Sequence, residues 1–227
     1  MPVALVTGGS AGLGRALVAG LVQRGWTVIT DGRDADRLAA VAGPGVITVS
    51  GDLTDADHRD ALIAAVEAAG RLDLLVHNVS TLGPTPLPRL DAVTPEDLQR
   101  TMRTNVGAPL ILTGLLLPAL VASNGILVGI SSDAAVEHYD GWGLYGATKA
   151  ALDHVVLQYA EENPAITAYA VDPGDMRTAM HQAAFPGEDI SDRPLPETVV
   201  PRILAALEDR PPSGRYRAAD LPAPVTT

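Results

Sequence analysis

Short apolar segments alternate with segments of helical periodicity along most of the chain. Uninterrupted apolar residues indicate buried strands, and apolar residues that recur every three or four positions indicate helices. The pattern predicts strands at about residues 3–6, 26–30, 46–49, 72–77, 126–130, 166–171 and 216–219. It predicts helices at about residues 12–24, 34–41, 54–69, 95–121, 143–162 and 197–207. Such alternation is typical of a parallel sheet covered on both faces, so we expect a Rossmann-like, doubly wound α/β fold of about seven strands in three layers.

Local signals mark where two of these helices begin. Thr94 precedes a proline and two acidic residues, which is a strong helix start, and Thr54 is expected to cap the helix after the third strand. No repeat or linker divides the 227 residues, so we expect a single domain spanning 1–227. The Pro-rich segments at 83–88 and 211–227 are interpreted as a loop and a C-terminal tail.

Composition narrows the classes of partner. The formal net charge is -11, which argues against nucleic acid and against an anionic membrane surface. Hydrophobic residues make up 47% of the chain, but the most apolar stretch, at 108–122, contains Pro118 and does not suggest a membrane span. The chain has no cysteine, and it begins with an apolar strand rather than a basic leader, so we expect a soluble, cytoplasmic protein.

A glycine-rich segment follows the first predicted strand and opens the first helix. Glycines at this place let the backbone turn tightly and approach a phosphate, while the helix N-terminus offers free N–H groups. In this strand–turn–helix context we expect a dinucleotide site whose pyrophosphate is contacted by Thr7, Gly8, Ser10, Gly12, Leu13 and Gly14.

The end of the second predicted strand carries both signals for the adenosine half of a dinucleotide. An acid such as Asp31 usually binds the ribose hydroxyls of NAD, whereas an arginine such as Arg33 usually accepts the 2′-phosphate of NADP. Together Arg33 and Arg15 favour NADP, with NAD as the alternative if Asp31 faces the ribose. After the third strand, Asp52 and Leu53 either contact the adenine or, in the case of Asp52, cap the helix that follows.

Lys149 is the only lysine of the chain and lies four residues after Tyr145. Residues four apart share a helix face, so the ammonium can lie beside the phenol. A nearby cation stabilises the phenolate and lowers the pKa of a tyrosine, which then exchanges protons near neutral pH. A surface Tyr and Lys on a helix is the simpler alternative for this pair taken alone.

The ordered motifs together resemble the short-chain dehydrogenase/reductase family, in its compact single-domain branch. Thr7 to Gly14 matches T-G-x-x-x-G-x-G, and Tyr145 and Lys149 match Y-x-x-x-K. Asn78 matches the asparagine after the fourth strand, and Asn105 matches the helix-four asparagine. Ser132 lies thirteen residues before the tyrosine, which is the family's usual interval. The P-G motif after the sixth strand is matched by Pro173 and Gly174, with Thr178. The resemblance extends to about Leu207.

The resemblance implies a role for each matching residue. Tyr145 acts as proton donor or acceptor, Lys149 holds the nicotinamide ribose and lowers the Tyr145 pKa, and Ser132 stabilises the substrate oxygen. Asn105 organises a water relay to Lys149. Ser131 is the rival for the serine role, but the two side chains alternate and the interval selects Ser132. Further cofactor contacts are implied for Asn78, Val79, Pro173, Gly174, Met176 and Thr178.

Two departures from the family pattern stand out. The fourth strand ends in His77-Asn78-Val79-Ser80 instead of N-N-A-G, so Val79 and Ser80 add bulk beside the adenosine pocket, and His77 is either a core histidine or a pocket residue. The C-terminus lacks the family's usual Gly-Gly ending. That region often builds a tetramer interface in relatives, so we expect a homodimer through the long helices starting near Pro95 and Gly143, with a tetramer as the alternative.

The substrate region is the least defined by the sequence. We expect a short, polar lid at 181–196 and a small or medium substrate. Candidate substrate contacts are Asp133, His138, Trp142, Asp175 and His181. Trp142 can also serve packing alone. No two histidines lie with acidic residues at the spacing of metal ligands, so we expect no catalytic metal.

We therefore expect an NAD(P)-dependent oxidoreductase, with NADP preferred, that acts on a ketone, an aldehyde or the corresponding alcohol. The leading direction is carbonyl reduction by NADPH. The alternative is a nucleotide-binding regulator or redox sensor on the same fold, because fold alone does not establish function. An isomerase or epimerase of the superfamily is less favoured, since those members are usually longer.

Overall fold

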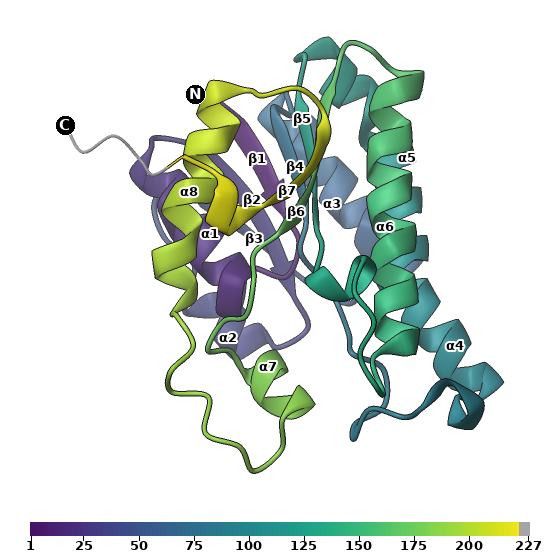
Figure 1. Ribbon diagram of the computed structural model, residues 1–227. Helices are drawn as coiled ribbons and strands as arrows, with labels where there is room; N and C mark the ends of the chain where they lie inside the picture. Colours follow the sequence, from purple (N-terminus) through teal and green to yellow (C-terminus); the bar gives the residue numbers. More distant parts are fainter. Residues whose placement is uncertain (223–227) are drawn as a thin grey trace.

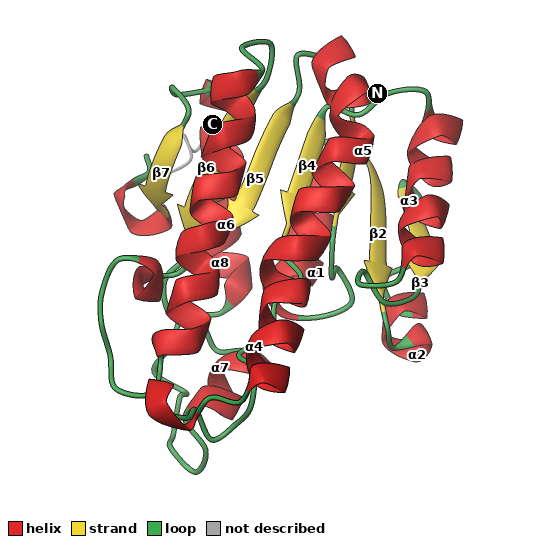
Figure 2. Cartoon of the chain, turned by 90° about the vertical axis from the view of Figure 1, so that its right-hand side faces the viewer, coloured by secondary structure: helices red, strands yellow, loops and turns green. Residues whose placement is uncertain are grey.

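The computed structural model describes residues 1–222 and contains one seven-stranded sheet in the order β3-β2-β1-β4-β5-β6-β7. All neighbouring strands are parallel (Figure 2). The strands are β1 (Val3–Val6), β2 (Thr27–Gly32), β3 (Val46–Ser50), β4 (Leu74–His77), β5 (Ile126–Ile130), β6 (Thr167–Asp172) and β7 (Gly214–Arg217). The predicted Rossmann-like fold is confirmed.

Helices cover both faces of the sheet (Figure 1). One face packs against α1 (Gly12–Gln23) and α8 (Pro196–Asp209), and the other against α3 (Ala56–Ala69), α5 (Ala108–Ala122) and α6 (Gly143–Glu162). Each face has its own core of Leu, Val, Ile and Ala, because strand side chains alternate between the two faces. The three predicted layers are present.

The long helix predicted at 95–121 is divided into three parts. It begins as α4 (Pro95–Met102), where Thr94 and Asp97 form the expected capping box. A π-helical turn, η2 (Arg103–Gly107), then precedes α5. Extra-wide turns of this kind are rare and often mark functional sites. The single element of the sequence pattern therefore carries a local irregularity that periodicity alone does not reveal.

Several predicted boundaries are wrong in detail. Thr54 does not cap α3; Asp55 occupies the cap position, and Thr54 bonds to Asp52 instead. The strand predicted at 216–219 is present as β7, two residues earlier, and the short helix η4 (Ala218–Asp220) follows it. The predicted lid begins inside α7 (Ala179–Ala184). The last part of the predicted tail, 223–227, lies outside the described residues.

The helix from Pro95 to Ala122 is long and apolar enough to cross a membrane by length and composition. In the structure it lies on the sheet, and Leu112, Leu116 and Leu120 are fully buried in the second core. Core helices of this kind satisfy the same criteria without entering a bilayer, so we interpret it as the central helix of this layer.

The strand order reverses between β1 and β4, because β2 lies on one side of β1 and β4 on the other. Ligands of open α/β sheets bind at the carboxyl edge beside such a reversal. The helices α2 (Ala35–Ala39) and α7 and the start of α4 lie around this edge (Figure 2).

Candidate active site

A long cleft runs along the carboxyl edge of the sheet. It is lined by the glycine loop, by the ends of β2 to β6, by the start of α4 and by α7. Most of the residues predicted for cofactor and catalysis line it, including Gly8, Ser10, Gly12 and Leu13 at one end and Ser132, Tyr145 and Lys149 at the other. The sequence motifs therefore meet in one place.

The glycine loop between β1 and α1 has the backbone geometry expected for phosphate binding. Gly8 and Gly12 have φ angles of 73° and 53°, which favour glycine. A Cβ at Gly14 would collide with the carbonyl oxygen of Gly8. Ala11, the cap residue of α1, makes no side-chain cap bond, so the first N–H groups of α1 face the cleft edge without a side-chain partner. A pyrophosphate fits this cradle, and the loop residues would hold it.

Thr7 and Asn78 fasten the loop to the neighbouring strand. The Thr7 hydroxyl donates to the Val76 carbonyl at 3.1 Å and accepts from the backbone N–H of Asn78 at 2.9 Å. The Asn78 side chain donates to the Thr7 and Gly8 carbonyls at 2.9 and 3.2 Å. Both residues therefore shape the loop from behind. Val79 lines the cleft beside them.

The histidine before Asn78 belongs to the core. His77 is 1% exposed, and its Nε2 lies 2.6 Å from the Thr113 hydroxyl. Burial lowers the pKa of His77 to about 3, so the ring is neutral across the physiological range. The interpretation as a core histidine fits this environment, and nothing links His77 to the cleft.

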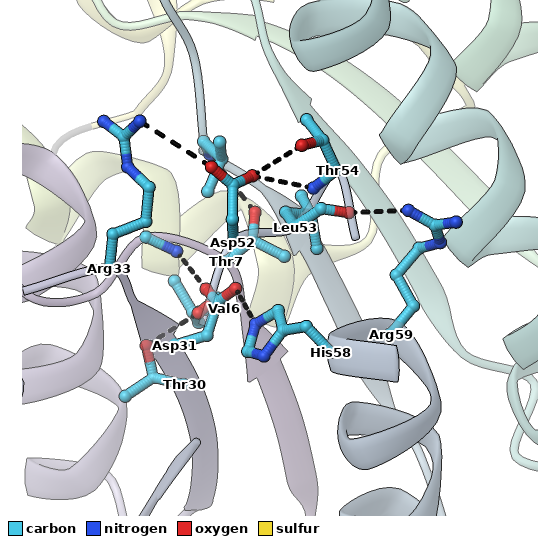
Figure 3. Close-up of polar contacts among 12 residues, drawn as sticks. Val6, Thr7, Thr30, Asp31, Arg33, Asp52, Leu53, Thr54, His58 and Arg59 are labelled. Carbon is cyan, nitrogen blue, oxygen red and sulfur yellow. Dashed lines mark hydrogen bonds and ion pairs between the residues drawn. The ribbon is translucent and has the colours of Figure 1, made fainter. Parts of the chain in front are cut away.

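Arg33 and Asp52 both line the end of the cleft that is predicted to hold the adenosine. The Arg33 guanidinium is exposed and lies 3.8 Å from the Asp52 carboxylate (Figure 3). Burial would raise the Asp52 pKa, but hydrogen bonds from Thr54 and the positive charges of Arg33 and Arg103 outweigh it and lower the pKa. Leu53 forms part of the floor. Arg15, by contrast, does not line the cleft, whereas Arg37, which sequence reasoning missed, does so from the start of α2.

Asp31 does not face the ribose position as a free acid. Its side chain is 2% exposed, and both of its carboxylate oxygens have partners (Figure 3). One accepts the Gly8 N–H at 2.6 Å, and the other lies 2.9 Å from Nε2 of His58 on α3. Asp31 therefore belongs to the cleft wall but is buried beneath the loop, and Arg33 is an exposed charged group just after the end of β2.

Tyr145 and Lys149 lie on one buried face of α6. Lys149 is 2% exposed, its Nζ donates to the Ile130 carbonyl at 2.7 Å, and it lies 5.5 Å from the centre of the Tyr145 ring. A surface pair is thus excluded. The helical spacing brought these two side chains together as expected.

The expected lowering of the Tyr145 pKa is not found. Burial raises the pKa of Tyr145 above its ordinary value, although the Ser132 and Ser80 hydroxyls act in the opposite direction. Burial also lowers the pKa of Lys149 to about 8, opposed by the charge of Asp153. The Lys149 ammonium donates to the Ile130 carbonyl and lies 5.5 Å from the centre of the Tyr145 ring, and burial is the largest influence on the Tyr145 pKa.

The two neighbouring serines have different partners. The Ser131 hydroxyl donates to Asp153 at 2.7 Å and is buried beside α6. The Ser132 hydroxyl donates to Asp133 at 3.0 Å and lies against the Tyr145 phenol. Ser132 is thus the serine beside the tyrosine. It lies two residues beyond the end of β5, not on the strand itself.

The guanidinium of Arg215, on the last strand, anchors the loop that carries Ser132. The sequence did not predict this contact. Arg215 on β7 donates to the Ser132 carbonyl at 2.8 Å and to Asp153 at 3.1 Å, and lies 3.7 Å from Asp172. Arg215, Asp153 and Asp172 come from β7, α6 and β6, and Ser132 follows β5, so only the fold brings them together.

Asn105 occupies the π-helical turn η2 and is fully buried. Its amide exchanges two bonds with the Thr81 backbone at 2.8 Å, and it donates to the Thr148 hydroxyl at 2.9 Å. Asn105 thus contacts α6 at Thr148, the residue that precedes Lys149, and makes no hydrogen bond to Lys149 itself. Ser80 donates to Asn105 at 3.3 Å and also approaches Tyr145, so it belongs to the catalytic region rather than the adenosine pocket.

The segment after β6 closes over the glycine loop. Pro173, Gly174 and Met176 line the cleft, and Thr178 caps α7 by accepting from the His181 N–H at 3.1 Å. A Cβ at Gly12 would lie 3.6 Å from the Thr178 side chain, so the two loops are adjacent.

The substrate end is built from loops and aromatic rings. The Trp142 ring lies 5.7 Å from Tyr145 and 5.8 Å from Phe185, and His181 stacks 4.8 Å from Phe185. Asp133 accepts from the Tyr139 hydroxyl at 2.9 Å, and Asp175 lies 3.8 Å from the His181 ring. All of these residues line the cleft, but His138 does not; it is exposed, and its neighbour Tyr139 takes that position.

Comparison with known proteins identifies the family of this chain. Residues 2–189 match the short chain dehydrogenase family. The serine 3-dehydrogenase of Agrobacterium fabrum is 35% identical over 77% of this chain and 72% of its own. The sepiapterin reductase of Xenopus tropicalis is 30% identical over 93% of this chain and 84% of its own. A short-chain dehydrogenase of Shigella flexneri solved with NADP has a TM-score of 0.88 and 30% identity, covering 96% and 97% of the two chains.

The chain belongs to the short-chain dehydrogenase/reductase family. It is an oxidoreductase that interconverts CH–OH and C=O groups with a nicotinamide coenzyme. The family explains why the glycine loop, the Tyr145–Lys149 pair and Ser132 share one cleft.

Proposed function

We propose that this protein is an NADPH-dependent carbonyl reductase that converts a ketone or aldehyde of a small to medium substrate to the alcohol, or catalyses the reverse oxidation. The observation that carries the proposal is the meeting of Ser132, Tyr145 and Lys149 at one end of a cleft whose other end holds the glycine loop. When bound, the coenzyme supplies or accepts the hydride.

The protein's own residues position the substrate oxygen and move the proton. Ser132 donates a hydrogen bond to that oxygen, and Tyr145 transfers the proton. Lys149 supplies a buried positive charge beneath Tyr145 and would hold the nicotinamide ribose. Asp133, Trp142, Asp175 and His181 form the substrate end, and the segment 181–196 acts as its lid.

NADP is the preferred coenzyme in this proposal, and NAD the alternative. Arg33 is exposed at the end of β2, while Asp31 is withdrawn into the protein. A guanidinium is suited to binding a phosphate with two parallel hydrogen bonds. The Shigella flexneri relative contains NADP, and a relative from Escherichia coli at 30% identity and a TM-score of 0.87 contains NADPH, which supports the same choice.

A screen of ketones and aldehydes with NADPH tests the function. We expect turnover in the wild type and a loss of about a thousandfold in Tyr145→Phe, because general acid catalysis contributes on the order of 10² to 10⁴. Tyr159→Phe is the matched control, since the Tyr159 hydroxyl donates to the Leu110 carbonyl away from the cleft. Equal turnover in wild type and Tyr145→Phe would contradict the proposal. A regulator or redox sensor would instead bind the coenzyme without turnover in either variant.

We further propose a cytoplasmic homodimer, formed through α4, α5 and α6, with neither nucleic acid nor a membrane as partner. The net charge of -11 supports the last point. Leu110, Ile111 and Leu115 are 44%, 46% and 50% exposed on the outer face of α5, which is the kind of surface that a second copy covers. Light scattering should give twice the chain mass, and Leu115→Glu should give the monomer mass. A wild-type monomer would contradict this assembly.

A further inference from the structure

The backbone of Gly8 is fixed on both sides by side chains, one half-buried and one buried. Its carbonyl accepts from Asn78 at 3.2 Å, and its N–H donates to Asp31 at 2.6 Å. Gly8 is the first glycine of the loop and has a φ of 73°, so the direction of the following residues depends on it. The Asn78 contact belongs to a residue that the family motif contains. The Asp31 contact has no counterpart in the motifs described above.

Asp31 is held in place by a second buried residue. Nε2 of His58 lies 2.9 Å from the other carboxylate oxygen, and the two side chains are 5% and 2% exposed (Figure 3). Because a carboxylate only accepts, His58 donates its Nε2 proton to Asp31. The His58 ring also packs against Gly51, where any Cβ would collide with it. The chain thus makes room for this ring at the end of β3.

The direction of Asp31 follows from the strand. Thr30 lies on the face of the sheet that α1 covers, and its hydroxyl donates to the Val6 carbonyl of β1. Alternation turns Asp31 to the other face, toward α3 and His58. A carboxylate in this position costs free energy unless both oxygens are paired. Gly8 and His58 supply that pairing, so the arrangement is self-consistent without a ribose.

We propose that Asp31 and His58 form a buried positioning pair that fixes Gly8, and with it the phosphate loop, and that Asp31 is not a ribose ligand. This inference rests on the proposed coenzyme binding. The pair acts on the pyrophosphate cradle, which NADPH and NADH share. Its loss therefore weakens both coenzymes by the same factor, whereas loss of a ribose ligand weakens NADH selectively.

Parallel fluorescence titrations with NADPH and NADH test the pair. We expect His58→Leu and Asp31→Ala each to raise both dissociation constants about tenfold, because Gly8 loses its fixed partner. His58→Gln, which keeps a donor for Asp31, should stay within about threefold of the wild type. His154→Leu, on the exposed face of α6, is the matched control and should change nothing. At saturating NADPH, kcat should change less than about twofold in the folded variants.

The outcomes separate the alternatives. A loss confined to NADH in Asp31→Ala, or unchanged binding in both His58→Leu and Asp31→Ala, would overturn the pair while leaving the proposed function intact. A wild type that binds neither coenzyme would overturn both. Thermal unfolding checks that each variant folds. Should His58→Leu and Asp31→Ala not fold, Asp31→Asn decides: near wild-type binding of both coenzymes supports the pair, and selective loss of NADH contradicts it.

Discussion

The two ends of the cleft are built in different ways. At the coenzyme end, backbone groups of the loop are fixed by the buried side chains of Thr7 and Asp31 and by the half-buried side chain of Asn78. At the substrate end, Asp133, Tyr139 and Phe185 lie on short helices and loops, and their contacts are mainly between side chains. A preorganised coenzyme site beside an adaptable substrate site suits a fold that serves many substrates with one chemistry.

The largest effect, on the free energy of unfolding, is expected for a residue that connects the two ends of the cleft. Arg215→Leu removes the guanidinium that pairs with Asp153 and bonds the Ser132 carbonyl. Breaking such a buried pair costs about 3–5 kcal/mol, and the partial exposure of Arg215, at 23%, points to the lower value. Chemical denaturation would measure the free energy of unfolding. Arg217→Leu on the same strand, which is exposed, is the control, and equal stability of the two variants would contradict this role.

The coenzyme end should be intolerant of added volume. Gly14→Ala places a Cβ against the Gly8 carbonyl, and the resulting strain of about 2 kcal/mol corresponds to roughly a thirtyfold rise in the NADPH dissociation constant. The control is Gly43, which has open space around it and no positive φ. Gly70 also has open space, but its φ of 77° would strain an alanine. Gly43→Ala should therefore bind NADPH normally. Normal binding by Gly14→Ala would show that the loop is not rigid.

The charge of Lys149 should set the alkaline limit of carbonyl reduction. Because burial lowers its pKa to about 8, Lys149 is protonated below that pH and loses its charge above it. We expect kcat/KM for the free enzyme to fall about tenfold per pH unit above pH 8. Lys149→Arg should be slower at every pH but should not show this fall, since arginine keeps its proton. A wild-type profile that is level to pH 10 would contradict the assignment.

The substrate end should tolerate change with the smallest effect. Trp142→Ala removes ring contacts with Tyr145 and Phe185, each pair contributing about 0.5 kcal/mol, so KM for the carbonyl substrate should rise roughly fivefold. The NADPH dissociation constant should not change. Steady-state kinetics and a coenzyme titration separate the two. A matching loss of NADPH binding would mean that the two ends are not independent.

The sequence predicted what depends on short intervals. The strand–glycine–helix pattern and the spacing of Tyr145 and Lys149 follow from local periodicity, and both are found in the cleft. Asp31 was not predictable in the same way, because a shift of one position along β2 decides which face its side chain takes. Its partner His58 carries no local signal for such a contact.

Other parts of the site depend on contacts between distant elements. Arg215 meets Ser132 across 83 positions, and Asn105 reaches Thr148 from a π-helical turn that periodicity does not reveal. Tyr139, and not the predicted His138, lines the substrate end, because the path of the loop decides which of the two side chains faces the cleft. Burial is the largest influence on the Tyr145 pKa and raises it, and the spacing of Tyr145 and Lys149 does not reveal the depth of burial.

The central claim is that the coenzyme end is preformed and selects NADPH through Arg33. Parallel titration of the purified protein with NADPH and NADH, followed by energy transfer from Trp26 and Trp142, tests it most directly. We predict that NADPH binds at least tenfold more tightly, about 1.4 kcal/mol, and that Arg33→Gln removes the difference. Equal or tighter binding of NADH by the wild type would contradict the claim.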